Sequence, residues 1–347
     1  MNRILKFTEA IHEATAQSLA QDERVYVLGL GVSYKNGADG TMGDLKMAYP
    51  DRILDTPVSE GATTGAAVGS ALTGSRPIIH HGRVEFALFA ADQIITQASK
   101  WNYMFGGDYP VPIVFRIAVG RQWGNGPQHT QALYSLFGNV VGLKVVIPSS
   151  PLMAKGLLVS AIQDNNPVVF LEPRWLYQTR GNVLEDYIGI PLDRARIVRE
   201  GQDITIVGYG DGLVDAYKAS KILEDHGVSA EVLDLVSINP IDYDLIKLSI
   251  GRTGRLLVVD TTNSAFNVGH EVLGRLFETC FSILKSAPIS LACPNVPCPT
   301  APSLTDKYYP TKISIVNAVL KMLSKPLVEE NMSFQDYNMA PTDVLDI

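Results

Sequence analysis

The sequence predicts an α/β protein with two doubly wound domains, each a mostly parallel β-sheet with helices on both faces. Short apolar runs rich in Val and Ile alternate with longer helical patterns through most of the chain, which is typical of parallel strands joined by helices. The chain has 347 residues. A single hydrophobic core rarely grows beyond about 250 residues, so we expect two domains.

Five strand candidates form the first series, with helical stretches between them. The strand candidates are 26–30, 76–81, 111–117, 143–148 and 167–173. Residues 86–105 are predicted to form a helix with an apolar face, and residues 150–165 are predicted to form a second helix. Ser150 and Pro151 fit the cap and the first position of that second helix.

A second series of strand candidates follows a polar stretch near residues 178–200. Its members are 204–210, 230–238, 255–260 and 289–293. We therefore place the first domain at residues 1–185, a linker at 186–200 and the second domain at 201–326. Residues 327–347 are polar, contain proline and show no apolar period, so we expect a mobile tail or an arm that wraps a partner.

Composition excludes several classes of partner. The net charge of -7 provides no positive field to attract nucleic acid or anionic lipid. No apolar run reaches the ~20 residues that a membrane-spanning helix needs. Hydrophobic residues make up 46% of the chain and charged residues 19%, a balance that favours buried subunit contacts. We expect an oligomeric, cytoplasmic protein that binds neither nucleic acid nor membranes.

The most informative segment is residues 52–74. An apolar strand is predicted to end at Thr56 and Pro57, and a helix of small residues is predicted to start at Ser59 and Glu60. Glu60 would then lie at the carboxyl end of a strand, where α/β sheets bind ligands. The alternative is that Glu60 only complements the positive end of the helix dipole. The small residues that would let another helix pack closely are Gly65, Ala66, Ala67, Gly69 and Ala71.

Further motifs follow downstream: RVEFALFAADQI at 83–94, GRQWGNGPQHTQ at 120–131 and AIQDNNPVVFLEP at 161–173. With DTPVSE at 55–60, this order and spacing resembles the beta subunits of 2-oxo acid dehydrogenase complexes, the pyruvate, acetoin and branched-chain family related to transketolase. The resemblance runs from about residue 4 to residue 325. It implies a transketolase-like pyrimidine-binding domain followed by a transketolase-like C-terminal domain.

The resemblance implies a thiamine-diphosphate enzyme and assigns roles to three residues. Glu60 matches the glutamate that bonds the aminopyrimidine ring of the cofactor. Phe86 matches the aromatic residue that stacks on this ring, where a flat apolar surface holds it. His129 matches the histidine beside the reacting carbon, and a histidine side chain can pass protons near neutral pH.

The chain also departs from its relatives beside the cofactor. Residues 80–85, HHGRVE, replace a more apolar segment, which makes His81 and Arg83 candidates for contacting the substrate. Arg83 could clamp a carboxylate or phosphate, because a guanidinium group matches such anions, or it could pair with Glu85. The C-terminal domain departs as well, which leaves docking to a lipoyl acyltransferase core open.

The resemblance also implies where metal ions bind. Several relatives hold a potassium ion at positions that match Ile113, Ala161, Asp164 and Asn166. In the family, the alpha subunit holds the diphosphate and its magnesium ion. The run from Gly210 to Gly212 imitates the diphosphate motif, but it opens the C-terminal domain, so we interpret it as a decoy.

We therefore expect a beta subunit that joins an alpha subunit in an α2β2 heterotetramer, decarboxylates a 2-oxo acid and passes the acyl group to a lipoyl carrier. One alternative is a split transketolase-like enzyme that transfers a carbon fragment to an aldehyde or sugar acceptor. The other is a non-catalytic scaffold for the alpha partner. Retention of Glu60, Phe86 and His129 argues against the scaffold.

Overall fold

The computed structural model describes residues 3–34, 36–121, 125–305, 307–329, 344–345 and 347. The chain separates into two compact units. The first unit holds the chain up to Val119, residues Leu136–Leu192 and the short strand β15 (Val344–Leu345). The second unit holds Gly120–Ser135 and the chain from Asp193 through helix α12 (Lys312–Met322). Both units alternate strands and helices, which confirms the predicted α/β class with two doubly wound domains.

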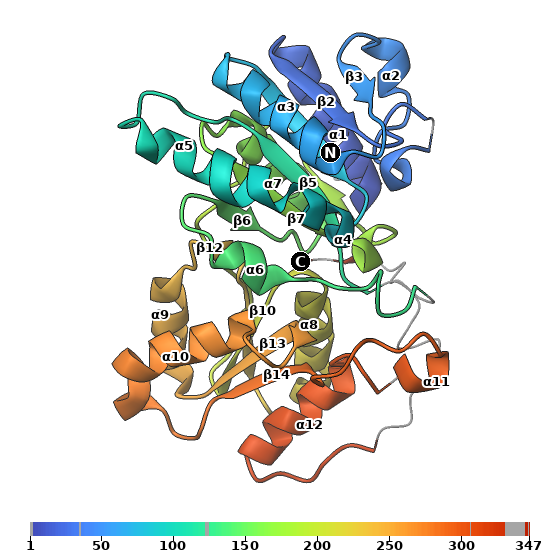
Figure 1. The fold of residues 1–347 in the computed structure, drawn as a ribbon. Helices are drawn as coiled ribbons and strands as arrows, with labels where there is room; N and C mark the ends of the chain where they lie inside the picture. The colour runs from blue at the N-terminus through green and yellow to red at the C-terminus, as the bar shows by residue number, and fades with distance from the viewer. Residues whose placement is uncertain (1–2, 35, 122–124, 306, 330–343, 346) are drawn as a thin grey trace. The chain divides into compact units, whose positions relative to one another are not determined.

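The first unit is built on a parallel sheet with the strand order β6-β7-β5-β4-β2-β3 (Figure 1). These strands are β2 (Val25–Gly29), β3 (Ile53–Asp55), β4 (Arg76–His81), β5 (Val114–Val119), β6 (Lys144–Val146) and β7 (Val168–Pro173). Every residue of β5 and β7 is buried. A strand that is covered on both faces has no need of alternating polar residues, which is why these segments read as continuous apolar runs.

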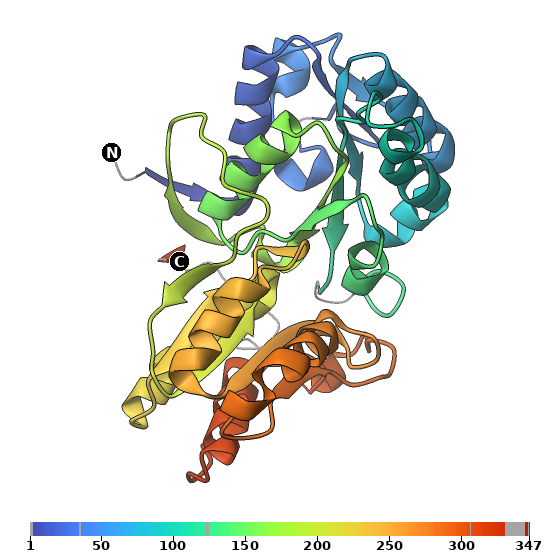
Figure 2. The same ribbon diagram turned by 90° about the vertical axis from the view of Figure 1, so that its left-hand side faces the viewer.

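Helices cover both faces of this sheet. Helices α1 (Phe7–Gln21) and α7 (Pro151–Gln163) lie on one face, and α3 (Glu60–Leu72) and α5 (Ser99–Met104) lie on the other (Figure 2). This arrangement follows from right-handed crossovers in a sheet whose strand order reverses. The start of α7 agrees with the prediction, because Ser150 Oγ accepts from Met153 N at 3.5 Å and Pro151 occupies the first turn.

Shorter elements complete the first unit. They are β1 (Arg3–Lys6), the 3-10 turn Ala38–Gly40, α2 (Leu45–Ala48), the 3-10 turn Arg174–Leu176 and β8 (Arg180–Val183). Strand β1 pairs antiparallel with β8, and β15 pairs parallel with the other side of β8. The short helix α6 (Tyr134–Gly138) begins where the chain returns from the second unit.

The stretch expected to be helical at residues 86–105 is helical, but the type of helix changes along it. The chain runs through α4 (Val84–Ala87), a 3-10 turn (Leu88–Ala90) and a π-helical segment (Asp92–Ala98) before α5, and the backbone stays in the helical region at each junction. The prediction of a helix here is confirmed. Two glycines of α3 bring it close to this stretch, because a Cβ at Gly61 would lie 3.1 Å from Phe89 O and one at Gly65 would lie 3.4 Å from Gln93 Oε1.

The second unit has a sheet in the order β14-β13-β10-β11-β9, in which only β9 is antiparallel to its neighbour. Its strands are β9 (Arg196–Arg199), β10 (Ile204–Gly208), β11 (Ala230–Asp234), β13 (Leu256–Asn263) and β14 (Ile289–Cys293). Helices α8 (Gly210–Asp225) and α12 lie on one face, and α9 (Tyr243–Thr253) and α10 (Val268–Cys280) lie on the other (Figure 1). Strand β12 (Ser237–Asn239), the 3-10 turn Phe281–Ile283 and α11 (Pro302–Thr305) also belong to this part of the chain.

The expected linker at residues 186–200 and the expected tail at residues 327–347 lie at the ends of the two domains predicted from the sequence. Strand β9 lies inside the stretch expected to be a linker. Most of the expected tail, at residues 330–343 and 346, lies outside the described residues, whereas Val344 and Leu345 pair with Arg180 and Gly181 of β8. Over the described ranges, no helix is both long enough and apolar enough to cross a membrane.

Candidate active site

A small cavity lies at the carboxyl ends of β2, β3 and β4 in the first unit, with a volume of about 80 Å³. Three residues expected from the sequence, Glu60, His81 and Phe86, line it together. Gly29, Thr63 and His80 are also part of its wall. Arg83 is not among the lining residues, and His129 belongs to the second unit.

Glu60 owes its place to the junction between β3 and α3. Strand β3 ends at Asp55 and α3 begins at Glu60, so the carboxylate is in the first helical turn, half-buried at the cavity wall. The junction is fixed by two hydrogen bonds to the end of β2: Thr56 N donates to Gly29 O at 3.2 Å, and Gly31 N donates to Asp55 Oδ1 at 2.5 Å.

Gly29 is required by the close approach of β2 and β4. Its φ of +152° is a conformation that favours glycine, and a Cβ there would lie only 2.6 Å from His80 O. Such a contact is far inside van der Waals range. Any larger residue would push the end of β2 away from the cavity.

His80 and His81 lie at the end of β4, and both are buried. Burial lowers the pKa of His81 to about 4, and burial together with the Arg116 guanidinium lowers the pKa of His80 well below its usual value. Both rings are therefore neutral near pH 7. His81 Nε2 lies 3.4 Å from Thr64 Oγ1, whereas the buried Nδ1 of His80 has no hydrogen-bond partner among the described residues.

His80 has no role predicted from the sequence, although it belongs to the segment at residues 80–85 that departs from the relatives. A buried nitrogen without a partner costs free energy unless a ligand or water satisfies it. On the neighbouring strand β5, Arg116 is the residue that pairs with His80. The only signal in the sequence was a pair of histidines at the end of an otherwise apolar strand.

Arg83 precedes α4 and is half-buried. Burial and the nearby Arg174 lower the pKa of Arg83, while Glu85 and Asp39 oppose this shift. Both interpretations of Arg83, a clamp for substrate and an ion-pair partner of Glu85, stay predictions.

The residues expected to hold potassium come together only in part. Asp164 pairs with Lys144 through one carboxylate oxygen, and the other oxygen accepts from Asn166 N at 2.8 Å and from Asn166 Nδ2 at 3.1 Å. The carbonyl oxygen of Asp164 accepts from Arg76 at 2.9 Å. Two cationic side chains thus occupy oxygens that a potassium ion would use, so the Asp164 carboxylate does not fit such an ion in this arrangement.

His129 lies in the loop Gly120–Ser135 of the second unit and is half-buried. Its backbone N donates to Gly126 O at 3.3 Å, and Thr130 Oγ1 donates to the same carbonyl at 2.7 Å. Gly120 N donates to Gln131 O at 2.9 Å, which ties the two sides of the loop together.

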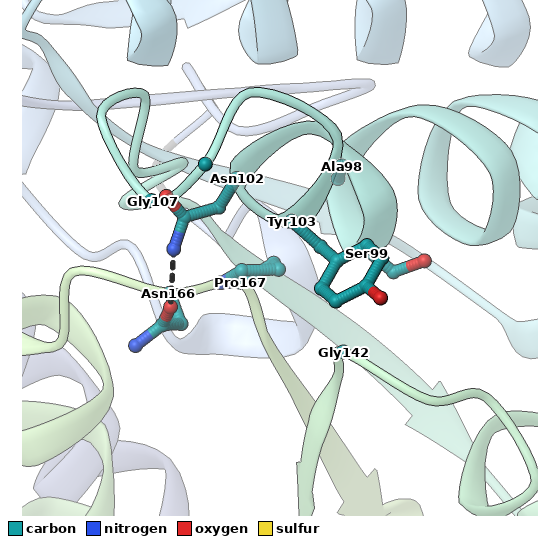
Figure 3. A pocket seen from close by; sticks show the side chains of 9 residues that line it. Ala98, Ser99, Asn102, Tyr103, Gly107, Gly142, Asn166 and Pro167 are labelled. Atoms are coloured by element: carbon teal, nitrogen blue, oxygen red, sulfur yellow. Dashed lines mark hydrogen bonds between the residues drawn. The ribbon is translucent and has the colours of Figure 1, made fainter.

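A larger cavity of about 440 Å³ lies elsewhere in the first unit (Figure 3). Asn102 and Asn166 face each other there at 3.5 Å, and Gly107, Gly142 and Pro167 form much of the wall. No acidic, basic or histidine side chain lines it. It brings in one residue of the expected potassium set but none of the expected catalytic groups.

Metal ligands of the usual kinds do not cluster in the described part of the chain. No three side chains of His, Cys, Asp or Glu come together there as a group that could hold an ion. Asp211, from the run interpreted as a decoy, is buried against Arg121 and Thr261 instead.

Comparisons with known proteins agree with the order of the two units. The family described as "Transketolase, pyrimidine binding domain" matches residues 4–180, and "Transketolase, C-terminal domain" matches residues 193–315. A solved structure titled "Split gene transketolase, inactive beta4 tetramer" has a similar fold, with a TM-score of 0.74 and 22% identity, and the match covers 92% of this chain and 98% of that one.

Curated relatives match over nearly the whole length. The chain is 38% identical to "Acetoin:2,6-dichlorophenolindophenol oxidoreductase subunit beta" of Bacillus subtilis, covering 94% of this chain and 99% of that one. The protein with the same description from Cupriavidus necator is 40% identical, with coverage of 93% and 98%. "Pyruvate dehydrogenase E1 component subunit beta" of Porphyra purpurea is 37% identical, with coverage of 93% and 98%.

Proposed function

The chain belongs to the family of pyruvate and acetoin dehydrogenase beta subunits, and we propose that it is the beta subunit of a thiamine-diphosphate-dependent 2-oxo acid dehydrogenase that works only with an alpha subunit. The observation that carries the proposal is the meeting of Glu60, Phe86 and His81 in one cavity at the carboxyl ends of the strands.

The cavity suits the aminopyrimidine ring of the cofactor. Phe86 offers a flat apolar face, and Glu60 offers a carboxyl group for a ring nitrogen. The unsatisfied Nδ1 of the neutral His80 ring provides one further hydrogen-bonding group in the same wall. We assign the cavity to the ring because these groups match its aromatic face and its polar edge.

When bound, thiamine diphosphate supplies the carbon nucleophile and the electron sink for cleaving the bond beside a carbonyl group. Glu60 then holds a proton at the ring nitrogen, Phe86 orients the ring, and His129 moves a proton near the reacting carbon. The neutral His81 packs against α3 through Thr64 and excludes water from that side.

The size and rim of the cavity support a site shared with the alpha subunit. A volume of about 80 Å³ is well below the roughly 300 Å³ at which ordinary ligand pockets begin, so it can hold only part of a cofactor. Apolar side chains around it are exposed, with Leu30 at 52%, Val58 at 73% and Phe89 at 76%. Such exposed apolar groups favour a partner surface. We propose that the alpha subunit covers them in an α2β2 assembly and holds the diphosphate and magnesium.

The identity of the substrate is the finer part of the proposal. We propose a 2-oxo acid as the donor and a lipoyl group as the acceptor, with acetoin as the competing donor because two relatives carry that name. The split transketolase alternative has only a shared fold behind it, at 22% identity. The scaffold alternative gains nothing from a cavity lined by Glu60, His81 and Phe86.

The proposal also includes a potassium site and a location in the cell. We propose potassium only as an ion held by backbone oxygens of Ile113, Ala161, Asp164 and Asn166, because Lys144 takes the Asp164 carboxylate. We propose a cytoplasmic location from the composition of the chain.

The test is to assay the chain with and without its alpha subunit. Pyruvate and acetoin are offered as donors and 2,6-dichlorophenolindophenol as the electron acceptor. We expect turnover only with both subunits, and strong turnover by this chain alone would contradict the proposal. A lipoyl domain and an aldehyde are then offered as carbon acceptors to separate the dehydrogenase from the transferase.

A variant pair connects the activity to Glu60. In the assembly, Glu60→Gln should lower turnover by a factor of about 100 or more while the subunits still co-elute, because the amide cannot supply the proton. Asp51→Asn removes an exposed carboxylate just ahead of β3 and serves as the control. Equal turnover of the two variants would remove Glu60 from the mechanism.

A further inference from the structure

The loop that carries His129 begins with a buried arginine that pairs with two carboxylates. Arg121 Nη2 lies 2.8 Å from Asp215 Oδ2, and Arg121 Nε lies 3.1 Å from Asp211 Oδ2. The exposed fractions of these side chains are 7% for Arg121, 3% for Asp211 and 13% for Asp215. An ion pair this well buried is poorly screened by salt and fixes the geometry of its partners.

Both carboxylates come from the start of α8, in the second unit. Asp211 and Asp215 are four residues apart and therefore lie on one face of the helix, where a single guanidinium fork can reach both. Thr261 Oγ1 donates to Asp211 Oδ1 at 2.9 Å, which holds that carboxylate in position. The Arg121 guanidinium also lies over the Tyr309 ring, 5.3 Å from its centre. The run that imitates a diphosphate motif is thus part of an anchor.

Two further contacts hold the same loop within the second unit. In the middle, Gly126 has a φ of +66°, and a Cβ there would lie 2.5 Å from Thr300 Oγ1. At the end, the rings of Tyr134 and Tyr209 meet edge to face with centres 5.7 Å apart. His129 lies between the second and third contacts, so its backbone is held on both sides.

We propose that Arg121, Asp211 and Asp215 form a clamp that positions the loop carrying His129, and that they act on the reaction through that loop without touching substrate or cofactor. The clamp itself rests on the distances above. Its catalytic consequence rests on the proposed function, in which His129 moves a proton. Loss of the clamp leaves His129 present but misplaced, and a displacement of about 1 Å can cost on the order of 100-fold in rate.

The experiment uses the complete αβ assembly and measures hydrogen exchange in a peptide that covers residues 125–131, together with kcat and KM for the 2-oxo acid. Arg121→Lys and Asp215→Asn should raise exchange in this peptide by about tenfold and lower kcat by about 10- to 100-fold, while KM changes less than about threefold. Asp215→Glu keeps the charge and should restore part of both.

Glu224→Gln is the matched control, because it removes a carboxylate from the same helix that pairs with Arg199 at 2.7 Å. Its exposed fraction is 70% and it lies at the opposite end of α8 from Asp211 and Asp215, so exchange and kcat should stay as in the unchanged protein. Unchanged exchange in both Arg121→Lys and Asp215→Asn would overturn the clamp.

A further variant tests the proposed role of His129 independently of the clamp. His129→Gln should abolish turnover while leaving exchange in residues 125–131 unchanged. If that variant keeps full turnover, the role of His129 fails even when the clamp variants loosen the loop. If the clamp variants loosen the loop and kcat does not fall, the positioning role is overturned and the function stands.

Discussion

Arg116 and Glu172 form an ion pair that is fully buried between β5 and β7 of the first unit. Arg116 Nε donates to Glu172 Oε1 at 2.6 Å, and Nη2 donates to Oε2 at 3.1 Å. Tyr177 donates to the same carboxylate at 2.9 Å, and Arg116 also donates to Thr41 Oγ1 at 3.0 Å. Glu172 therefore balances the permanent charge of Arg116 within the same sheet, whereas His80 stays neutral because burial and the nearby Arg116 guanidinium both lower its pKa.

Glu172→Gln should strongly destabilise the chain, because it leaves Arg116 buried without a counter-charge. We expect a loss of about 3–5 kcal/mol in the free energy of unfolding, measured by urea denaturation. Tyr177→Phe removes only one hydrogen bond to the same carboxylate and should cost about 1 kcal/mol. If Glu172→Gln lowers the free energy of unfolding no more than Tyr177→Phe does, then Glu172 is not the counter-charge on which the buried Arg116 depends.

Acid should destabilise the first unit between about pH 6.5 and pH 4, because His81 is charged in the unfolded chain below 6.5 but in the folded chain only below about 4. The unfolded state binds more protons over this window, so stability falls as pH falls. The shift corresponds to roughly 3 kcal/mol for a group this deeply buried.

His81→Gln should reduce the slope of stability against pH in that window. His80 contributes in the same direction, because its pKa is also lowered. The measurement is the free energy of unfolding at half-unit steps from pH 4 to 7. His226 lies exposed at the end of α8, so His226→Gln is the control, and the same slope in all three proteins would contradict the expected pH dependence.

Gly69→Ala should stabilise the isolated chain but weaken assembly. Gly69 is exposed on α3, and a Cβ there would meet nothing within 4 Å, so alanine should add about 0.5–1 kcal/mol through helix propensity. The small-residue face of α3 would then be less able to pack against a partner helix. Melting temperature and size-exclusion of the αβ assembly test both parts, and an assembly of unchanged affinity would exclude this face from the subunit contact.

Phe86→Ala should weaken the binding of thiamine diphosphate to the assembly by about tenfold, because the aminopyrimidine ring loses the apolar surface on which it stacks. Phe281→Ala removes another exposed phenylalanine, in the second unit, and is the control. Fluorescence titration of the cofactor measures both affinities. Equal affinities would remove Phe86 from the cofactor site.

Local patterns in the sequence predict the individual elements well. The run RPIIHH becomes β4, and Ser150 and Pro151 cap α7, because strand periodicity and helix capping depend on neighbouring residues. The cavity formed by Glu60, His81 and Phe86 follows from strand ends that meet at one edge of a parallel sheet.

Other features depend on contacts that no local pattern contains. Arg121 meets Asp211 and Asp215 from about ninety residues away, so the sequence offers no sign that this loop clusters with the second unit. Likewise, the pairing of Lys144 with Asp164 and the change of helix type before α5 arise from packing between distant segments.

The chain enters the second unit at Gly120–Ser135 and returns to the first before it enters the second again at Asp193, so a gene split at the domain boundary would separate this loop from the rest of its unit. A cut between residues 192 and 193 would produce a shorter polypeptide with Glu60, Phe86 and His129 all present. That fragment would lack α8, and with it the carboxylates that receive Arg121. Even with the alpha subunit present, such a piece should regain activity only by complementation with the remainder of the polypeptide, and a fission event at this point would require both halves to be inherited together.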